Sequence, residues 1–474
     1  MKGKYRLLLP RLGSASGYSN GNIPEACLTT KEQLDFYNHL GSNQIEGFAP
    51  VSSLRLKGFL CSTQRKKRYD PSWNYSDDPS RPYTHPIHPY PAMMIPQVAG
   101  RLLDGYGKRN AVVLDPFCGS GTVLLEAVVR GHNAYGIDIN PLSLLISKVK
   151  TTPLNPGLLE EELEKILKKT LSIKKIEYPQ FPNIEYWFKP PVITKLAALK
   201  RVIETISDQD VRNFFKVVFS FTVRASSNTR NDEFKLYRME EEKLKDFNPP
   251  VIEIFEERAR RNISFMSELW SVAKDINPAV EILNEDTRHK TSVPSRKIDI
   301  VVTSPPYGDS KTTVAYGQFS RLSLQWLGFN GDAVKIDVHS LGGRLDVHNL
   351  QLVYSSPHLV EVLDSIEKID KKRAREVMAF YIDLRKCFNE LSRVIKKGGF
   401  LCMVVGNRTV KGVQLPTDEI VADFGETIGF KHVETIIRKI PNKRMPLKNS
   451  PTNKPGEVCS TMLEEYIVIM EKNN

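Results

Sequence analysis

Short hydrophobic runs alternate with amphipathic stretches along much of the chain, and this alternation predicts strands and helices in turn. Residues 111–114 form a short apolar run that is typical of a buried strand, and residues 115–122 form a turn that contains two glycines. Residues 123–130 suit a helix, and residues 133–137 suit a second strand. This order of elements predicts a βαβ unit with two parallel strands.

The same alternation resumes later in the chain. Residues 280–283 and 298–302 predict two strands, and the second is rich in β-branched residues. Residues 377–395 carry apolar side chains at three- and four-residue spacing, which predicts a helix that Gly398 and Gly399 would end. The last predicted elements are a strand over 400–405, a helix over 418–425, and strands over 432–437 and 464–470. The pattern predicts an α/β fold with a doubly wound, mostly parallel sheet that ends in a C-terminal antiparallel hairpin.

Two stretches interrupt the alternation and divide the chain into regions. Residues 151–275 carry apolar stripes at helical spacing, which predicts a mainly helical insert. Residues 309–376 contain scattered glycine, histidine and tyrosine, and they predict a second insert. The predicted regions are a loop-rich basic N-terminal region over 1–83, core segments over 84–150, 276–308 and 377–474, and the two inserts between them.

Composition narrows the classes of protein that fit. The chain has 474 residues, of which 41% are hydrophobic, so a packed core is expected and wholesale disorder is excluded. A formal net charge of +12 favours a polyanionic partner, without distinguishing DNA, RNA or an acidic membrane. We find no apolar stretch long enough to span a bilayer and no signal sequence, so we expect a cytoplasmic protein. Six scattered cysteines predict neither a disulfide framework nor a zinc ribbon.

The glycine turn after the first predicted strand indicates a nucleoside cofactor. Gly119 and Gly121 allow the backbone to approach a ligand closely. A dinucleotide site favours a third glycine at position 124, where this chain has leucine. Asp138, at the end of the second strand, can accept both hydroxyls of a ribose. A nucleoside without a pyrophosphate is therefore expected, and S-adenosylmethionine fits; the alternative is a glycine turn of any α/β fold.

A second motif, Thr303-Ser-Pro-Pro-Tyr-Gly308, follows the predicted strand over 298–302. Two prolines cannot continue a strand, so backbone carbonyls are left to face a cleft. The Ser304 hydroxyl and the Pro305 carbonyl can accept hydrogen bonds from an exocyclic amino group, which turns its lone pair toward a methyl donor. Tyr307 offers a face for stacking with a base that has left its helix. A structural turn without chemistry is the alternative.

These motifs resemble those of the amino-group DNA methyltransferases. Residues 115–122 are similar to motif I and residues 304–307 to motif IV, in the serine form typical of cytosine-N4 enzymes. Residues 84–92, 138–141 and 284–286 resemble motifs X, II and III. The resemblance implies that S-adenosylmethionine is bound by Asp115, Pro116, Phe117, Gly119, Ser120, Gly121, Thr122, Asp138, Ile139, Asp286, His88 and Pro89, and that Ser304, Pro305, Pro306 and Tyr307 are catalytic.

Several activities are compatible with these motifs. The order X, I, IV differs from that of cytosine-N4 enzymes in which motif IV comes first, and it is common in adenine-N6 enzymes, which usually carry Asp or Asn where this chain has Ser304. Guanine-N2 enzymes of tRNA also usually have Asn or Asp there. A cytosine-C5 mechanism needs a Pro-Cys nucleophile, which does not occur in this chain. A non-catalytic DNA-binding subunit would be expected to show a decayed motif, and both motifs are intact.

The leading prediction is a site-specific cytosine-N4 methyltransferase acting on double-stranded DNA. It would flip its target base and transfer the methyl group directly, without a metal ion. We expect no membrane partner, and a separate restriction endonuclease as a possible partner enzyme. Target readout is expected from the inserts, with either base-edge contacts or a solvated loop at Arg224, Asn228 and Arg230, near Lys235 and Arg238. After motif IV, Tyr316, Gln318, Arg321 and Arg344 are candidates to close over the base. Phosphate contacts are expected from residues 65–68 and from Arg438, Lys439, Lys443, Arg444, Lys448 and Lys454.

Histidines provide weak candidates for a metal site. His85 and His88 lack a third ligand nearby, so a proline-rich loop packed against the cofactor pocket is the preferred interpretation. His339 and His348 are likewise weak candidates for metal ligands.

Overall fold

The computed structural model describes residues 65–78, 80–173, 176–230, 234–276, 278–309, 312–329, 333–440, 448–449, 459–460 and 462–473. All of them belong to one compact unit, Leu56–Asn474. Most of the expected N-terminal region over 1–83 lies outside the described residues. Among the described helices, none is long and apolar enough to cross a membrane.

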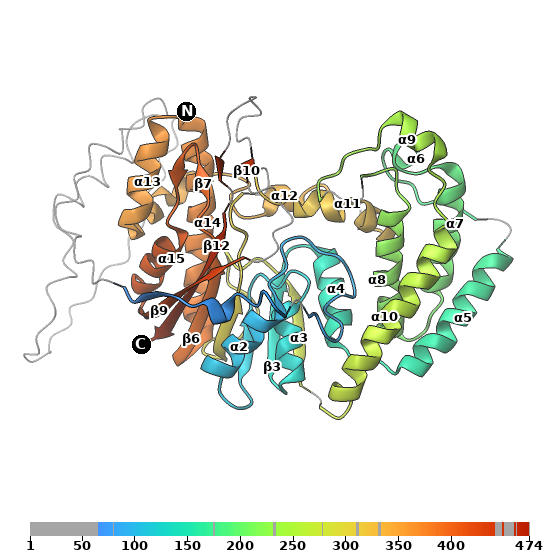
Figure 1. Cartoon of the computed structure of the whole chain (residues 1–474), viewed down its shortest axis with the longest axis horizontal. Coiled ribbons are helices and arrows are strands. Elements are labelled where there is room, and N and C mark those ends of the chain that lie inside the picture. The colour runs from blue at the N-terminus through green and yellow to red at the C-terminus, as the bar shows by residue number, and fades with distance from the viewer. Residues whose placement is uncertain are drawn as a thin grey trace, which may run out of the picture. The chain divides into compact units, whose positions relative to one another are not determined.

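An eight-stranded sheet forms the core of the unit (Figure 1). Neighbouring strands are parallel except at β12, which runs antiparallel to both β6 and β9. The doubly wound sheet and the C-terminal antiparallel pair are thus confirmed. In spatial order the strands are β4 (Val280–Asn284), β3 (Asn133–Asp138), β2 (Val112–Asp115), β5 (Ile298–Thr303), β6 (Ile395–Val405), β12 (Glu464–Lys472), β9 (Phe430–Lys439) and β1 (Lys67–Tyr69).

Side chains alternate between the two faces of the sheet because successive strand residues point to opposite sides. On one face, Val113 of β2 and Ile300 of β5 belong to a core covered by α2 (Pro96–Tyr106) and α3 (Thr122–Val129). On the other face, Leu114 belongs to a core built with three helices. They are α13 (Pro357–Glu367), α14 (Lys371–Val394) and α15 (Thr417–Glu426). Because helices cover both faces of the sheet, the central strands are buried on both sides, and their sequences are continuous apolar runs.

The glycine pair Gly398–Gly399 does not end a helix as expected. Helix α14 ends at Val394 and β6 begins at Ile395, so the pair lies inside the strand. The pairing between β5 and β6 shifts register there, between Ile298 and Ile300, and Gly398 has φ of +68°. A Cβ at Gly399 would lie 2.9 Å from the carbonyl oxygen of Asp299. The glycines are therefore needed for an irregularity within the sheet.

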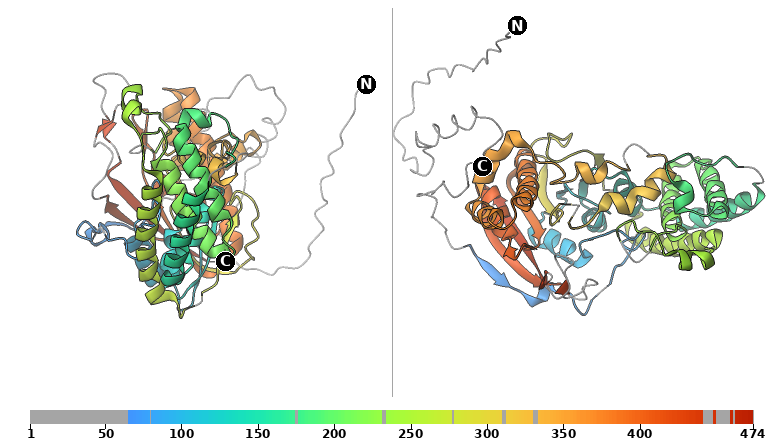
Figure 2. Two further views of the ribbon diagram at one scale, coloured as in Figure 1. Left: turned by 90° about the vertical axis from the view of Figure 1, so that its right-hand side faces the viewer. Right: turned by 90° about the horizontal axis from the view of Figure 1, so that it is seen from above.

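The first insert is helical, as predicted. Most of its helices share one apolar core with α4 (Pro141–Thr151) of the sheet domain and α11 (Tyr316–Leu327) of the second insert, and the insert helices group together in Figures 1 and 2. Trp326 is fully buried there, with its ring edge-to-face with Phe188 at 5.6 Å. The insert helices are α5 (Pro156–Ser172), α6 (Ile184–Trp187), α7 (Pro190–Glu204), α8 (Gln209–Ala225), α9 (Glu241–Asp246) and α10 (Val251–Ala273).

Short elements complete the described structure. They are η3 (Pro71–Trp73), α12 (Ile336–His339), η4 (Val347–Ser355), β7 (Thr409–Val410), β8 (Val413–Gln414), β10 (Lys448–Asn449) and β11 (Cys459–Ser460).

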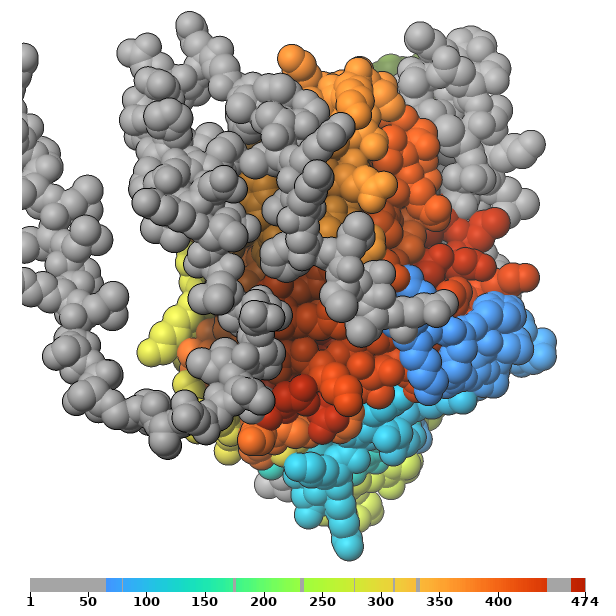
Figure 3. Space-filling view, turned by 90° about the vertical axis from the view of Figure 1, so that its left-hand side faces the viewer, coloured from blue at the N-terminus to red at the C-terminus, as the bar shows by residue number. Residues whose placement is uncertain are grey.

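The basic run over 65–68 contains most of edge strand β1, and its side chains form ion pairs that hold this strand against the rest of the fold. β1 pairs in parallel with β9, and the blue N-terminal segment lies against the red C-terminal elements (Figure 3). Arg65 bonds Asp423 at 2.6 Å and Glu419 at 2.5 Å, both on α15. Arg68 bonds Glu434 of β9 at 2.9 Å. The charges of this run are paired with carboxylates, most of them distant in sequence, so the run has a structural role in holding β1, and phosphate contact stays a prediction.

Candidate functional site

The carboxyl ends of β2, β3, β4 and β5 meet at one edge of the sheet. Asp115 ends β2, Asp138 ends β3, and Ser304 directly follows β5. Strands β3 and β4 lie on one side of β2, and β5 lies on its other side, so the strand order reverses between β2 and β5. Ligands of open α/β sheets bind at such a point.

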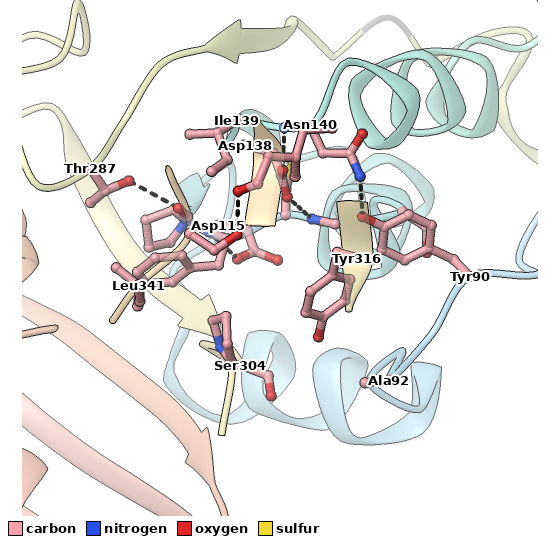
Figure 4. A pocket seen from close by; sticks show the side chains of 18 of the residues that line it. Tyr90, Ala92, Asp115, Asp138, Ile139, Asn140, Thr287, Ser304, Tyr316 and Leu341 are labelled. Carbon is pink, nitrogen blue, oxygen red and sulfur yellow. Dashed lines mark hydrogen bonds between the residues drawn. The ribbon is translucent and has the colours of Figure 1, made fainter. Parts of the chain in front are cut away.

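A pocket of about 930 Å³, including its opening to solvent, lies at this edge (Figure 4). Many of the residues predicted from the sequence line it: Asp115, Pro116, Phe117, Gly119, Ser120, Thr122, Asp138, Ile139, Asp286, Ser304 and Pro306. The structure therefore brings the two motifs to one cavity, although they are far apart in the chain.

Asp115 links the glycine turn to the second motif. Its Oδ1 accepts hydrogen bonds from the Thr303 hydroxyl at 2.7 Å and from the backbone N–H of Phe117 at 3.1 Å. Burial raises the pKa of Asp115 to about 7, although both hydrogen bonds favour the charged form. Its first role is thus to fix the ends of β2 and β5 together.

Asp138 holds the backbone of the glycine turn. Its two carboxylate oxygens accept from the N–H of Gly119 at 2.9 Å and from the N–H of Asn140 at 2.8 Å. Burial raises its pKa. Asp138 also lines the pocket, where its carboxylate can meet the hydroxyls of a ligand.

Asp286 belongs to an ion-pair chain that forms one wall of the pocket. Arg288 bonds Asp286 at 2.6 Å and Asp383 of α14 at 2.9 Å, and it donates to the carbonyl of His339 at 2.7 Å. Burial raises the pKa of Asp286, but bonding to Arg288 outweighs it, and the pKa is lowered overall. Asp286 could be predicted from its motif, but Arg288 and Asp383 are distant in the chain, and only the fold brings them together.

The opposite wall is aromatic. Tyr90 stacks on Tyr316 with ring centroids 5.8 Å apart, and Figure 4 shows both across the pocket from Leu341. The Asn140 side chain donates to the Tyr90 hydroxyl at 3.1 Å. Tyr90 lies within the segment that resembles motif X, and Tyr316 is among the residues expected near the base.

The Ser-Pro-Pro-Tyr segment is held by hydrogen bonds behind the pocket. The Ser304 hydroxyl donates to the Tyr307 hydroxyl at 3.3 Å, which in turn donates to Glu465 of β12 at 3.0 Å. Ser304 and Pro306 line the pocket, whereas Pro305 and Tyr307 do not. Burial raises the pKa of Tyr307 well above its usual value. Its phenol therefore stays protonated and able to donate.

His88 and Pro89 do not line the pocket, whose lining begins at Tyr90. The His88 Nε2 lies 2.7 Å from the Ser220 hydroxyl of α8, and its ring is buried. These contacts fix the proline-rich segment against the insert, and direct cofactor contact by His88 and Pro89 stays a prediction. Gly121 is also outside the lining; its φ is +76°, and a Cβ there would lie 2.8 Å from the Ser147 hydroxyl.

Several predicted nucleic-acid contacts are also corrected. Asn228 is buried and donates to the Tyr186 carbonyl at 3.1 Å, and the Arg224 guanidinium lies 4.4 Å from the Phe319 ring centroid. Arg438 is buried, forms an ion pair with Glu465 and donates to the Trp73 carbonyl at 2.7 Å. Lys443, Arg444 and Lys454 lie outside the described residues, as does the side chain of Lys448.

The described part of the chain contains no group of three or more His, Cys, Asp or Glu side chains that could hold a metal ion. His85, one of the histidines considered above, has its Nε2 2.8 Å from a Glu126 oxygen instead.

Comparison with known proteins identifies the family. A family model described as DNA methylase matches residues 26–148. The type II methyltransferase M.MvaI of Kocuria varians is 44% identical over 416 residues, which are 82% of this chain and 91% of that one. This chain belongs to the type II methyltransferases. The methyltransferase is also 23% identical over 442 residues to M.BsoBI of Geobacillus stearothermophilus, covering 79% of this chain and 83% of that one.

Similarity to solved structures is lower. A SAM-dependent methyltransferase from Methanosarcina mazei covers 81% of this chain and 99% of its own, at 9% identity and a TM-score of 0.30.

The methyltransferase is a DNA-modifying enzyme of the restriction–modification type, with S-adenosylmethionine as its cofactor. The pocket fits this cofactor. Gly119 has φ of +47° and lines the cavity, so the backbone can approach a ligand there. Carboxylates at strand ends can accept from hydroxyl and amino groups, and Phe117, Ile139 and Leu341 give apolar surface for a planar ring.

Proposed function

We propose that this methyltransferase modifies the N4 amino group of cytosine in double-stranded DNA. One observation carries the proposal: the Ser304 hydroxyl lies in the pocket and gives its hydrogen to Tyr307. Its lone pairs therefore remain as acceptors for an incoming N–H group. An exocyclic amine needs such acceptors, because its own lone pair is delocalised into the ring.

Ser304 sits where its acceptor can act on a base inside the pocket. It directly follows β5, and the Asp115–Thr303 hydrogen bond of 2.7 Å holds that strand end beside the glycine turn. We infer that the Ser304 hydroxyl and the backbone carbonyl of Pro305 orient the target nitrogen. This arrangement supports direct in-line transfer, because holding two reactants in position can contribute about 7 to 11 kcal/mol.

S-adenosylmethionine, when bound, supplies a sulfonium-activated methyl group. The protein's own contribution is to bind and orient. We propose that Asp138 accepts the ribose hydroxyls and that Asp286, held by Arg288, accepts from the adenine amino group. The rest of the cofactor would contact the glycine turn at Gly119, Ser120 and Thr122.

A base in a duplex cannot reach a pocket at a sheet edge, so we propose that the target cytosine is flipped out. Glu465 fixes the Tyr307 hydroxyl before any base arrives. The Tyr307 ring lies outside the pocket lining, and we propose that it borders the position that the flipped base takes, where its fixed orientation reduces the entropy lost on stacking. We further propose that the inserts over 151–275 and 309–376 supply target recognition, and that a separate restriction endonuclease cleaves the same site.

Nucleoside analysis tests the proposed substrate. DNA incubated with the protein and S-adenosylmethionine is digested, and the nucleosides are separated and identified by mass spectrometry. We expect N4-methylcytosine, abolished by Ser304→Ala and retained by Ser271→Ala, an exposed serine on α10. N6-methyladenine in its place would contradict the cytosine assignment, and methylation of tRNA alone would contradict DNA as substrate.

A further inference from the structure

Helix α14 begins with a basic run that the motifs do not explain. Its first three residues are Lys371, Lys372 and Arg373, Arg375 follows closely, and its first turn contains no acidic residue. The helix dipole places partial positive charge at the N-terminus of a helix, so cations are unfavourable there. The run therefore does not stabilise its own helix, which points to a role outside the helix.

The run lies at the edge of the sheet that holds the pocket. Helix α14 leads directly into β6 at Ile395, so it runs back along the sheet and begins near the carboxyl ends of the parallel strands. Asp309, which follows the Ser-Pro-Pro-Tyr segment, forms an ion pair with Arg373 at 3.3 Å. Arg373 also donates to the Thr312 hydroxyl at 2.8 Å. The first turn of α14 is thus joined to the segment that carries Ser304.

Arg373 and the N-cap residue Asp370 have partners inside the fold. Arg373 forms a second ion pair with Glu376 at 2.6 Å. Asp370 accepts from the backbone N–H of Arg373 at 2.9 Å and pairs with Lys411, which follows β7, at 3.1 Å. These contacts fix the start of α14 without the side chains of the two lysines.

Lys371 and Lys372 differ from Arg373 because both are exposed. Within the described part of the chain, neither side chain forms an ion pair with a carboxylate. The basic run over 65–68 contrasts with this arrangement, because its side chains are paired with acids. Two uncompensated positive charges therefore face solvent at the fixed start of α14.

We propose that Lys371 and Lys372 bind phosphates of the DNA backbone beside the target base. The inference rests on the proposed function, for which it names a surface that holds the duplex. A duplex carries one negative charge per about 1.7 Å of its axis, and lysines that contact its phosphates release bound counter-ions. A lysine is a flexible point charge, so it can reach a phosphate without a preformed cavity. Through Arg373 and Asp309, the bound backbone is held at a fixed position relative to Ser304.

Methylation of a plasmid at several salt concentrations tests the proposal against a merely solvated helix face. Tritium transfer from S-adenosylmethionine gives kcat and kcat/KM for DNA in the wild type and in Lys371→Ala/Lys372→Ala. Each lost phosphate contact reduces the slope of log affinity against log salt by about 0.9, so the double variant should lose about 1.8 from its slope of log kcat/KM. We expect kcat/KM to fall at least tenfold at about 0.1 M salt, with the loss in KM.

Two further double variants control for the charge and for the helix. Lys371→Arg/Lys372→Arg keeps both cations and should keep the wild-type slope. Lys108→Ala/Arg109→Ala removes two exposed cations that precede β2, at the opposite edge of the sheet, and should also keep that slope. Asp370 still caps α14 in every variant, so urea unfolding should show no loss of stability.

Other outcomes would overturn the inference. A wild-type slope in the alanine variant would show that the run is only a solvated face. A loss confined to kcat, with an unchanged slope, would show that the lysines act in packing around the Ser304 segment instead. Absence of transfer to DNA by the wild type would contradict DNA as the substrate and the inference with it. Methylated adenine would contradict the cytosine assignment alone, because the salt comparison counts methyl groups on either base.

Discussion

Tyr307 donates its phenolic hydrogen to Glu465 at 3.0 Å, which ties the Ser-Pro-Pro-Tyr segment to β12 at the other end of the chain. Glu465 also forms an ion pair with the buried Arg438 of β9. Arg438 in turn donates to the carbonyls of Trp73 and Asn74, at 2.7 and 3.1 Å. The tyrosine is therefore anchored to three separate parts of the sequence.

Removing this anchor should affect both stability and catalysis. Glu465→Ala leaves Arg438 buried without its carboxylate, and breaking a buried pair in this way costs about 3 to 5 kcal/mol. Glu465→Gln keeps an acceptor for Tyr307, so it should retain more activity at a smaller loss of stability. Urea unfolding and kcat for both variants check this. Equal kcat in Glu465→Ala and the wild type would contradict a role in orienting Tyr307.

Asp115 should make stability depend on pH. Burial raises its folded-state pKa to about 7, above the unfolded value near 3.9, so the folded protein binds the extra proton between these values. Its contribution is present at low pH and is lost as pH rises toward 7. Each pH unit corresponds to about 1.4 kcal/mol. From pH 5 to 7, we expect the wild type to lose roughly 2 to 3 kcal/mol of unfolding free energy relative to Asp115→Asn. Parallel pH profiles of the two proteins, from urea unfolding, would contradict the raised pKa.

Arg65 should matter for folding and not for DNA affinity. Its guanidinium bonds acids on α15, and hydrogen bonds to charged groups contribute about 1.5 to 3 kcal/mol. We therefore expect Arg65→Ala to lower the free energy of unfolding by about 2 kcal/mol. Removing a phosphate contact reduces the slope of log affinity against log salt by about one. We expect that slope to be unchanged in Arg65→Ala, and a slope reduced by one would support the phosphate interpretation. Lys66→Ala is the control: its side chain is 68% exposed, so its loss should leave the free energy of unfolding unchanged.

The central sheet could be predicted from sequence because its signal is local. Each buried strand is a short apolar run, and turn residues mark its ends, so β2, β3, β5 and β9 were found within a few residues. Strand β1 could not be predicted because its three residues, Lys67–Tyr69, are exposed at the edge of the sheet and two of them are charged. Only its pairing with a distant strand identifies it.

The site was predicted in part for the same reason. Asp115, Asp138 and Ser304 follow strands directly, so their convergence at one edge follows from parallel strand order. Arg288 and Leu341 were missed because their places depend on contacts between distant segments. Arg224 and Asn228 were misread because polarity in sequence does not reveal burial, which here comes from packing against α11 and from the Tyr186 carbonyl.

The most direct test of the account is methyl transfer measured beside cofactor binding. Tritium transfer from labelled S-adenosylmethionine into DNA is compared in the wild type, Ser304→Ala and Tyr307→Ala, with cofactor affinity measured by calorimetry on the same preparations. We predict that both variants bind the cofactor as the wild type does but transfer methyl groups at least a hundredfold more slowly, about 2.7 kcal/mol of lost transition-state stabilisation. Wild-type rates in both variants would contradict the account.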